Sequence, residues 1–117
     1  MTPNLFEEVD EGAGGEAALR ARWRDLVERE LPGAARSRPD WPVRFDHCFA
    51  RILLDCVHDR PWREVVRPPA WRNAAPAKLA RALSLGRDVL ADRADLGDLN
   101  QRSLRLRGKA GDGVASK

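Results

Sequence analysis

The sequence lacks any long hydrophobic run, since its uninterrupted apolar stretches reach no more than three residues, as in Ile52–Leu54. A helix that crosses a bilayer needs about 20 apolar residues, so we expect no membrane span and no membrane partner. The first eight residues, from Met1 to Glu8, have neither the basic start nor the apolar stretch of a secretory signal. These two absences predict a cytoplasmic protein.

Cysteine and histidine are scarce, with two of each. On one helix, Cys48 and Cys56 would lie about 12 Å apart along the axis, which is too far for a disulfide, so we interpret them as reduced core thiols. No Cys/His cluster has the spacing of metal ligands, and no Walker loop, GxSxG or HExxH motif occurs. We therefore expect no metal and no cofactor, and hydrolytic catalysis is not indicated.

What the sequence does contain is enough apolar material for one core. Of its 117 residues, 43% are hydrophobic and 33% are charged, which is typical of a globular domain rather than of a disordered chain. The first residues are acidic and rich in glycine, and the last are basic with several glycines. We predict a mobile acidic arm at 1–15, a single helical domain at 16–107 and a flexible basic tail at 108–117.

The spacing of apolar residues is helical, and no alternating strand pattern occurs. The predicted fold class is all-α, a compact bundle of about five helices with a buried central helix at 43–58. Gly86 in the middle of one helix predicts a close helix crossing. Four further helices are expected. The first covers 16–31 and stops at Pro32-Gly33, and the second begins after a cap at Asp59 with Pro61 in its first turn. The third runs from about Asn73 and Pro76 to Leu90, and the fourth from a cap at Asp95 to about Leu104.

The central helix has a wide apolar arc and one narrow polar strip, which consists of Arg44, His47, Arg51, Asp55 and His58. Neighbours three or four residues apart can touch on a helix, so Arg51 can reach Asp55 and Asp55 can reach His58. A carboxylate beside a histidine fixes the tautomer of its ring, as acid–base and anion-binding sites require. The alternative is a solvated helix face with one weak ion pair.

The positive charge is unevenly distributed. The net charge is +3, but residues 1–16 carry five acidic groups and no basic one, which leaves +8 for the rest. Basic clusters at 60–81 and 101–117 favour a phosphate-facing surface, although charge runs are often only solvated and 18 of the 21 basic residues are arginines, as in proteins from GC-rich genomes. The candidate phosphate contacts are Arg60, Arg63, Arg67, Arg72, Arg102, Arg105 and Arg107.

Three tryptophans lie next to proline or arginine in the sequence, namely Trp41, Trp62 and Trp71. Together with the arginines they could form a surface on which bases stack. The commoner role of tryptophan is to anchor a core or a loop.

Three segments resemble a family of short uncharacterised microbial proteins, some of them labelled GNAT acetyltransferase-like. They are Trp41–Asp55, Arg67–Ala70 and Leu99–Leu104 with Arg107-Gly108-Lys109, within a resemblance over about 19–109. The resemblance implies that His47, Cys48, Phe49, Arg51 and Asp55 belong to the recognisable part of the family. The label implies a mixed α/β fold with an acetyl-CoA loop of the form Q/R-x-x-G-x-G/A before a helix, and Arg105–Ala110 has these letters without a preceding strand pattern.

These observations leave three hypotheses. The first is a non-enzymatic basic module that binds DNA or RNA, or a nucleic-acid-associated protein partner. The second is an acyl-CoA-dependent acetyltransferase or an anion-ligand site on the polar strip. The third is an adaptor whose acidic arm folds over the basic surface until a partner displaces it. The oligomeric state stays open.

Overall fold

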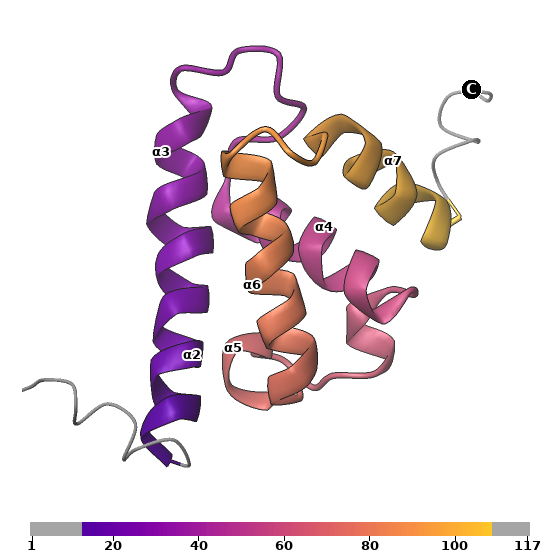
Figure 1. The fold of residues 1–117 in the computed structure, drawn as a ribbon. Coiled ribbons are helices and arrows are strands. Elements are labelled where there is room, and N and C mark those ends of the chain that lie inside the picture. The colour runs from indigo at the N-terminus through magenta and orange to yellow at the C-terminus, as the bar shows by residue number, and fades with distance from the viewer. Residues whose placement is uncertain (1–12, 109–117) are drawn as a thin grey trace, which may run out of the picture.

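A computed structural model describes residues 13–108, and every regular element in this part is helical (Figure 1). The predicted all-α fold is confirmed, with no strand between residues 13 and 108. Apart from residues 13–15 and Gly108, the predicted acidic arm and basic tail lie outside the described residues. The elements are α2 (Ala13–Asp25), the π-helical turn η1 (Leu26–Glu30), α3 (Leu31–Ala35), α4 (Asp46–His58), the 3-10 turn η2 (Trp62–Glu64), α5 (Ala70–Asn73), α6 (Pro76–Leu90) and α7 (Leu96–Leu106).

The first helix does not stop at Pro32-Gly33 as predicted, because α2, η1 and α3 follow one another without a break to Ala35. The wide π turn explains how the helix passes Pro32. At its end the Leu31 N–H donates to the Leu26 carbonyl, five residues back, so the backbone is widened directly before the proline ring. Pro32 then occupies the first turn of α3, where its missing N–H costs little.

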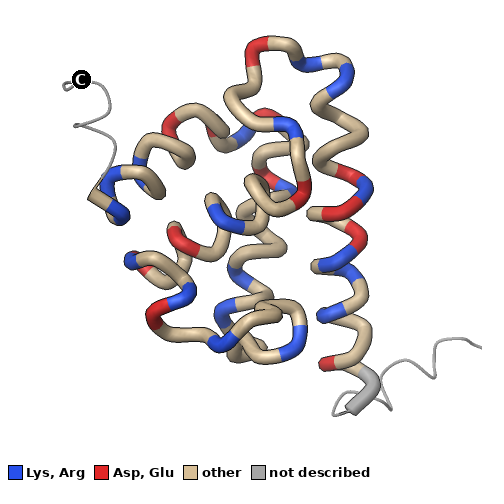
Figure 2. Tube along the Cα trace, turned by 180° about the vertical axis from the view of Figure 1, so that it is seen from behind, with Lys and Arg blue, Asp and Glu red and all other residues tan. Residues whose placement is uncertain are grey.

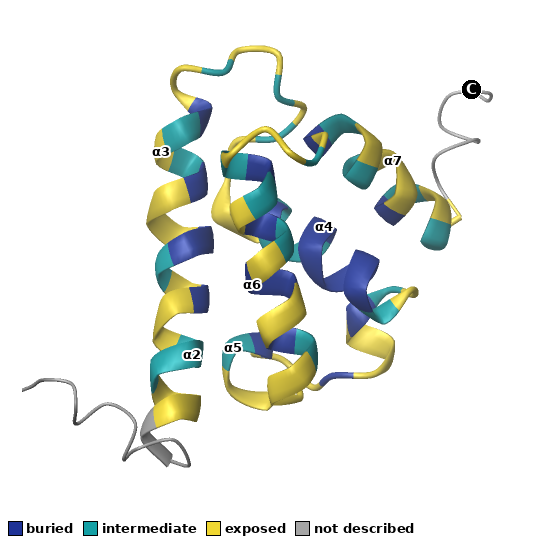
Figure 3. Cartoon of the chain, viewed as in Figure 1, coloured by how far each residue is buried: buried dark blue, intermediate teal, exposed yellow. Residues whose placement is uncertain are grey.

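Helix α4 is the buried centre of the bundle, as predicted, although it begins at Asp46 rather than at residue 43. Its residues Ile52–Val57 are all buried, and Figure 3 shows most of this helix in the colour of buried residues. Asp59 does not cap the next helix. It adopts the left-handed conformation with φ 62° and ends α4 by donating its N–H to the Asp55 carbonyl at 2.7 Å.

Helix α6 packs against both α2 and α4, while α7 packs against α4 (Figure 1). The predicted close crossing at Gly86 is present, because a Cβ there would clash with Leu26 and would lie 3.1 Å from Leu53 Cδ1. The predicted cap at Asp95 is also present, since its Oδ1 accepts the Asp98 N–H at 3.0 Å. Asn73 does not start α6. It lies in the short helix α5, which the sequence did not predict, and its amide donates to the Arg67 carbonyl.

Two tryptophans, Trp23 and Trp62, belong to the core, and Trp41 and Trp71 are half-buried against it. Both cysteines are free thiols, with Cys56 buried and Cys48 half-buried. The prediction of a core thiol therefore holds for Cys56 and not for Cys48, which is half-buried. None of the helices in the described range is long and apolar enough to cross a membrane.

Candidate anion-binding site

The predicted polar strip does not form one site, because its five residues have separate partners. Arg44 precedes α4 and donates to the Ala35 carbonyl at 2.6 Å, which ties the connecting loop to the end of α3. His58 is half-buried and donates from Nδ1 to the Leu54 carbonyl of its own helix at 2.8 Å. His47 is exposed, with its Nδ1 3.5 Å from Asp46 Oδ1. The direct Asp55–His58 and Arg51–Asp55 contacts that we expected are not formed.

Asp55 is instead the centre of a buried network between α4 and α7. Its side chain is fully buried and accepts four hydrogen bonds. Oδ1 accepts the Trp62 backbone N–H at 2.8 Å and Arg107 Nη2 at 3.0 Å, whereas Oδ2 accepts Ser103 Oγ at 2.7 Å and Arg107 Nε at 2.6 Å. A buried carboxylate is tolerated only with such partners, so this aspartate holds η2 and the end of α7 onto α4.

Arg51, one turn before Asp55 in α4, belongs to the same network. Its Nη1 donates to Ser103 Oγ at 2.7 Å and its Nη2 to Asn100 Oδ1 at 2.9 Å. Burial lowers the pKa of Arg51, and the charge of Arg107 acts in the same direction. The hydrogen bonds to Asp55 raise the pKa of Arg107. The network therefore contains two guanidinium groups and one buried carboxylate, with Arg51 linked to Asp55 through Ser103, which leaves an excess of positive charge at this point.

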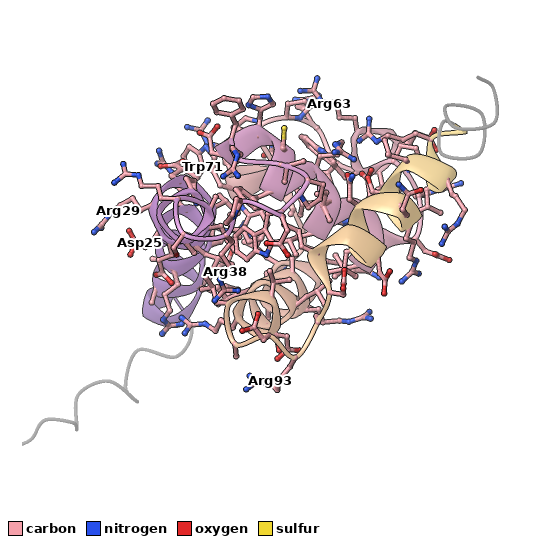
Figure 4. All side chains as sticks on the ribbon, turned by 90° about the horizontal axis from the view of Figure 1, so that it is seen from above. Asp25, Arg29, Arg38, Arg63, Trp71 and Arg93 are labelled. Atoms are coloured by element: carbon pink, nitrogen blue, oxygen red, sulfur yellow. The ribbon has the colours of Figure 1, made fainter. Side chains whose placement is uncertain are left out.

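A pocket of about 470 Å³ opens beside this network and is lined by His47, Ala50, Arg51, Trp62, Arg63 and Arg107. We call it the basic pocket. Arg63 is exposed, and its guanidinium lies over the Trp62 ring at 5.1 Å from the centroid. Figure 4 shows Arg63 at the edge of the molecule. No carboxylate is among the lining residues, so the arrangement suits an anion.

The remaining predicted phosphate contacts do not reach this pocket. Arg102 pairs with Asp59 at 2.7 Å, Arg60 lies 3.7 Å from Glu64, and Arg72 lies over Trp71. Arg67 and Arg105 are exposed elsewhere on the surface. Lysine and arginine dominate the segment from Arg60 to Arg81, whereas α2 carries both acidic and basic residues (Figure 2). The basic pocket thus combines part of the polar strip with part of the arginine set.

Sequence reasoning missed Ser103 and Asn100 as partners of the strip. Ser103 could have been noticed in the sequence, because it occupies a position on the apolar face of α7 that is otherwise filled by leucine. A hydroxyl at such a position indicates a buried polar partner.

Comparison of the chain with protein-family models, with curated proteins and with solved structures found no match. The family resemblance therefore stays a hypothesis. The letters of the acetyl-CoA loop begin at the carboxyl end of α7, where the Gly108 N–H donates to the Arg105 carbonyl at 2.9 Å. A pyrophosphate loop needs the amino end of a helix, where free N–H groups point outward. At Arg105–Gly108 the backbone thus has the wrong polarity for such a loop.

Proposed function

We propose that this domain binds nucleic acid and that the basic pocket holds a backbone phosphate. The supporting observation is that Arg107 binds the Asp55 carboxylate directly and Arg51 binds the same network through Ser103, next to Arg63 and His47. Arginine pairs phosphate oxygens in a bidentate manner, and an anion here would balance the excess positive charge.

The geometry also supports a preorganised site rather than a mobile charge patch. Arg51 and Arg107 are each held by two hydrogen bonds to the protein, so little side-chain entropy is lost when an anion binds. Arg63 is the mobile member, since its contact within the described residues is the stack on Trp62. We assign it the role of closing on the phosphate from the open side.

The acyl-CoA alternative receives less support. Its strip residues Arg44, His47 and His58 are separated into different environments, and the described part of the chain contains no sheet. The adaptor hypothesis depends on residues 1–15, most of which lie outside the described range.

A salt titration of the full chain with a fluorescent oligonucleotide tests the proposal. Binding should be tight at low salt and weaken steeply as salt rises, because each neutralised phosphate releases counterions. Replacing Arg63 by alanine should weaken binding and reduce the salt slope by about one unit.

Arg93→Ala is the matched control, because it removes the same charge at an exposed position that pairs with Asp88 and lies far from Arg63 in Figure 4. It should leave the affinity within about twofold of wild type, since it touches no proposed phosphate contact. Absence of binding at low salt, or equal losses in the two variants, would refute the phosphate assignment.

A further inference from the structure

A second, smaller pocket adjoins the basic pocket and differs from it in chemistry. Its volume is about 150 Å³, and it shares the walls His47, Ala50 and Trp62 with the basic pocket. We call it the tryptophan pocket, because Trp23, Trp62 and Trp71 all line it. The two pockets are therefore neighbours, and we call the tryptophan pocket the aromatic end and the basic pocket the cationic end of this part of the surface.

The size and the aromatic walls of the tryptophan pocket suit a flat ring. Trp71 is half-buried, and the guanidinium of Arg24 lies over it at 4.5 Å from the ring centroid. A cavity of about 150 Å³ is known to accept one benzene ring, so the volume matches a single six-membered aromatic ring. Stacking of a base on indole or guanidinium planes is a common source of affinity for single-stranded nucleic acid.

Two carboxylates, Asp46 and Glu28, line the tryptophan pocket and are absent from the lining of the basic pocket. These carboxylates repel a phosphate, because both are negatively charged, and they accept hydrogen bonds from an amino group. Asp46 Oδ1 already accepts the His47 backbone N–H at 2.7 Å, whereas its Oδ2 has no hydrogen-bond partner in the described part of the chain. Glu28 is held by Arg24 at 3.2 Å.

His47 lines both pockets, and its ring packs against an exposed phenylalanine. Its ring stacks in parallel on Phe45, with centroids 6.0 Å apart and planes 4° apart. Phe45 is 65% exposed, so the stacked pair presents a flat aromatic surface to solvent next to the pockets that His47 lines. A neighbouring base of the same strand would stack on this surface.

We infer that the tryptophan pocket takes one unstacked base of a single strand, and that this base is a pyrimidine with an amino group, as in cytosine. Its size favours one ring, and its carboxylates favour the cytosine amino group over the carbonyl of thymine or uracil. The inference rests on the proposed function, because the adjoining phosphate would occupy the basic pocket. A base of a duplex is stacked and paired, so it cannot enter the pocket unless the duplex opens at that base.

Fluorescence anisotropy with 12-nucleotide oligo-dC, oligo-dT and a random duplex tests this. Oligo-dC should bind at least about fivefold more tightly than oligo-dT, and it should quench the tryptophan fluorescence. Replacing Asp46 by asparagine should abolish the preference for dC and leave the salt slope unchanged. Asp98→Asn is the matched control, since Asp98 occupies the first turn of α7 as Asp46 occupies that of α4, and it should keep the preference.

Cytidine monophosphate distinguishes a strand from a free nucleotide. It should compete with oligo-dC only at much higher concentration, and competition equal to that of the oligomer would overturn the strand assignment. Equal binding of dC, dT and duplex would overturn the base pocket while leaving the proposed phosphate site intact. If no nucleic acid binds at low salt, the proposed function itself fails.

Discussion

The two ends of helix α4 use polar side chains in opposite ways. Near its carboxyl end, the Asp55 side chain is 0% exposed, and its hydrogen bonds go to η2, to α7 and to Arg107 at the end of α7. At its amino end, the His47 side chain is 78% exposed and borders two pockets. Both residues lie on the same polar strip, so the difference comes from α7, which covers only one end. We expect changes at the Asp55 end to lower stability strongly, and a change at His47 to affect binding with little effect on stability.

The largest effect should follow from Asp55→Ala. The substitution leaves the Trp62 N–H, Ser103 and the Arg107 guanidinium without their acceptor, and breaking a buried charge pair costs about 3–5 kcal/mol. Urea denaturation followed by circular dichroism measures this loss.

Asp59→Asn is the control for Asp55→Ala, because Asp59 also binds an arginine of α7 but is exposed. Asparagine tolerates the left-handed backbone of this position, so the cost should stay below about 1 kcal/mol. Equal losses in the two variants would show that the burial of Asp55 is not the source of its effect on stability.

Ser103→Ala should have the next largest effect. The hydroxyl donates to Asp55 Oδ2 and accepts from Arg51 Nη1, so its removal leaves a buried carboxylate and a half-buried guanidinium short of one partner each. We expect a loss of about 1–3 kcal/mol in the free energy of unfolding. A loss of affinity for nucleic acid should accompany it, because Arg51 is then no longer fixed. Unchanged stability would mean that water replaces the hydroxyl without cost.

Much of the fold follows from local patterns. The apolar spacing of α4 and α6, the Asp95 cap and the Gly86 crossing are all readable from neighbouring residues. Pro32 and Asp59 were misread because a π turn and a left-handed C-cap depend on the three-dimensional setting of the chain.

The candidate site was only partly predictable, for the same reason. The sequence identified Arg51, His47, Arg63 and Arg107, but in two separate groups. Periodicity shows which residues share a face of one helix, and it does not show which face a second helix covers. Arg107, which binds the Asp55 side chain, is 52 residues away in the sequence, so helical spacing of i+3 or i+4 could not reveal this contact.

Alkaline pH should lower the stability through the buried thiol of Cys56, by less than the Ser103→Ala substitution does. Burial raises the pKa of the Cys56 thiol above its ordinary value of 9.0. Above that pH the unfolded chain loses this proton before the folded one does, so stability falls as pH rises, by up to about 1.4 kcal/mol per pH unit. The chain has no tyrosine, which keeps this range free of phenol titration.

The measurement is urea unfolding at several pH values above about 9, compared among variants. Cys56→Ala should flatten the decline, whereas the matched control Cys48→Ala should keep it, because it leaves the buried Cys56 thiol in place. Identical slopes in the two variants would remove the buried thiol as the cause.

The smallest effect on stability should come from His47→Ala. Its ring is exposed and contacts Phe45 and Asp46, so its loss should change the free energy of unfolding by less than about 0.5 kcal/mol. The same variant should weaken binding of oligo-dC, because His47 forms the wall shared by both pockets. Urea unfolding and anisotropy on one preparation measure both quantities. A drop in stability comparable to that of Ser103→Ala, with unchanged binding, would show that the open end of α4 is structural as well, and the contrast between the two ends would then disappear.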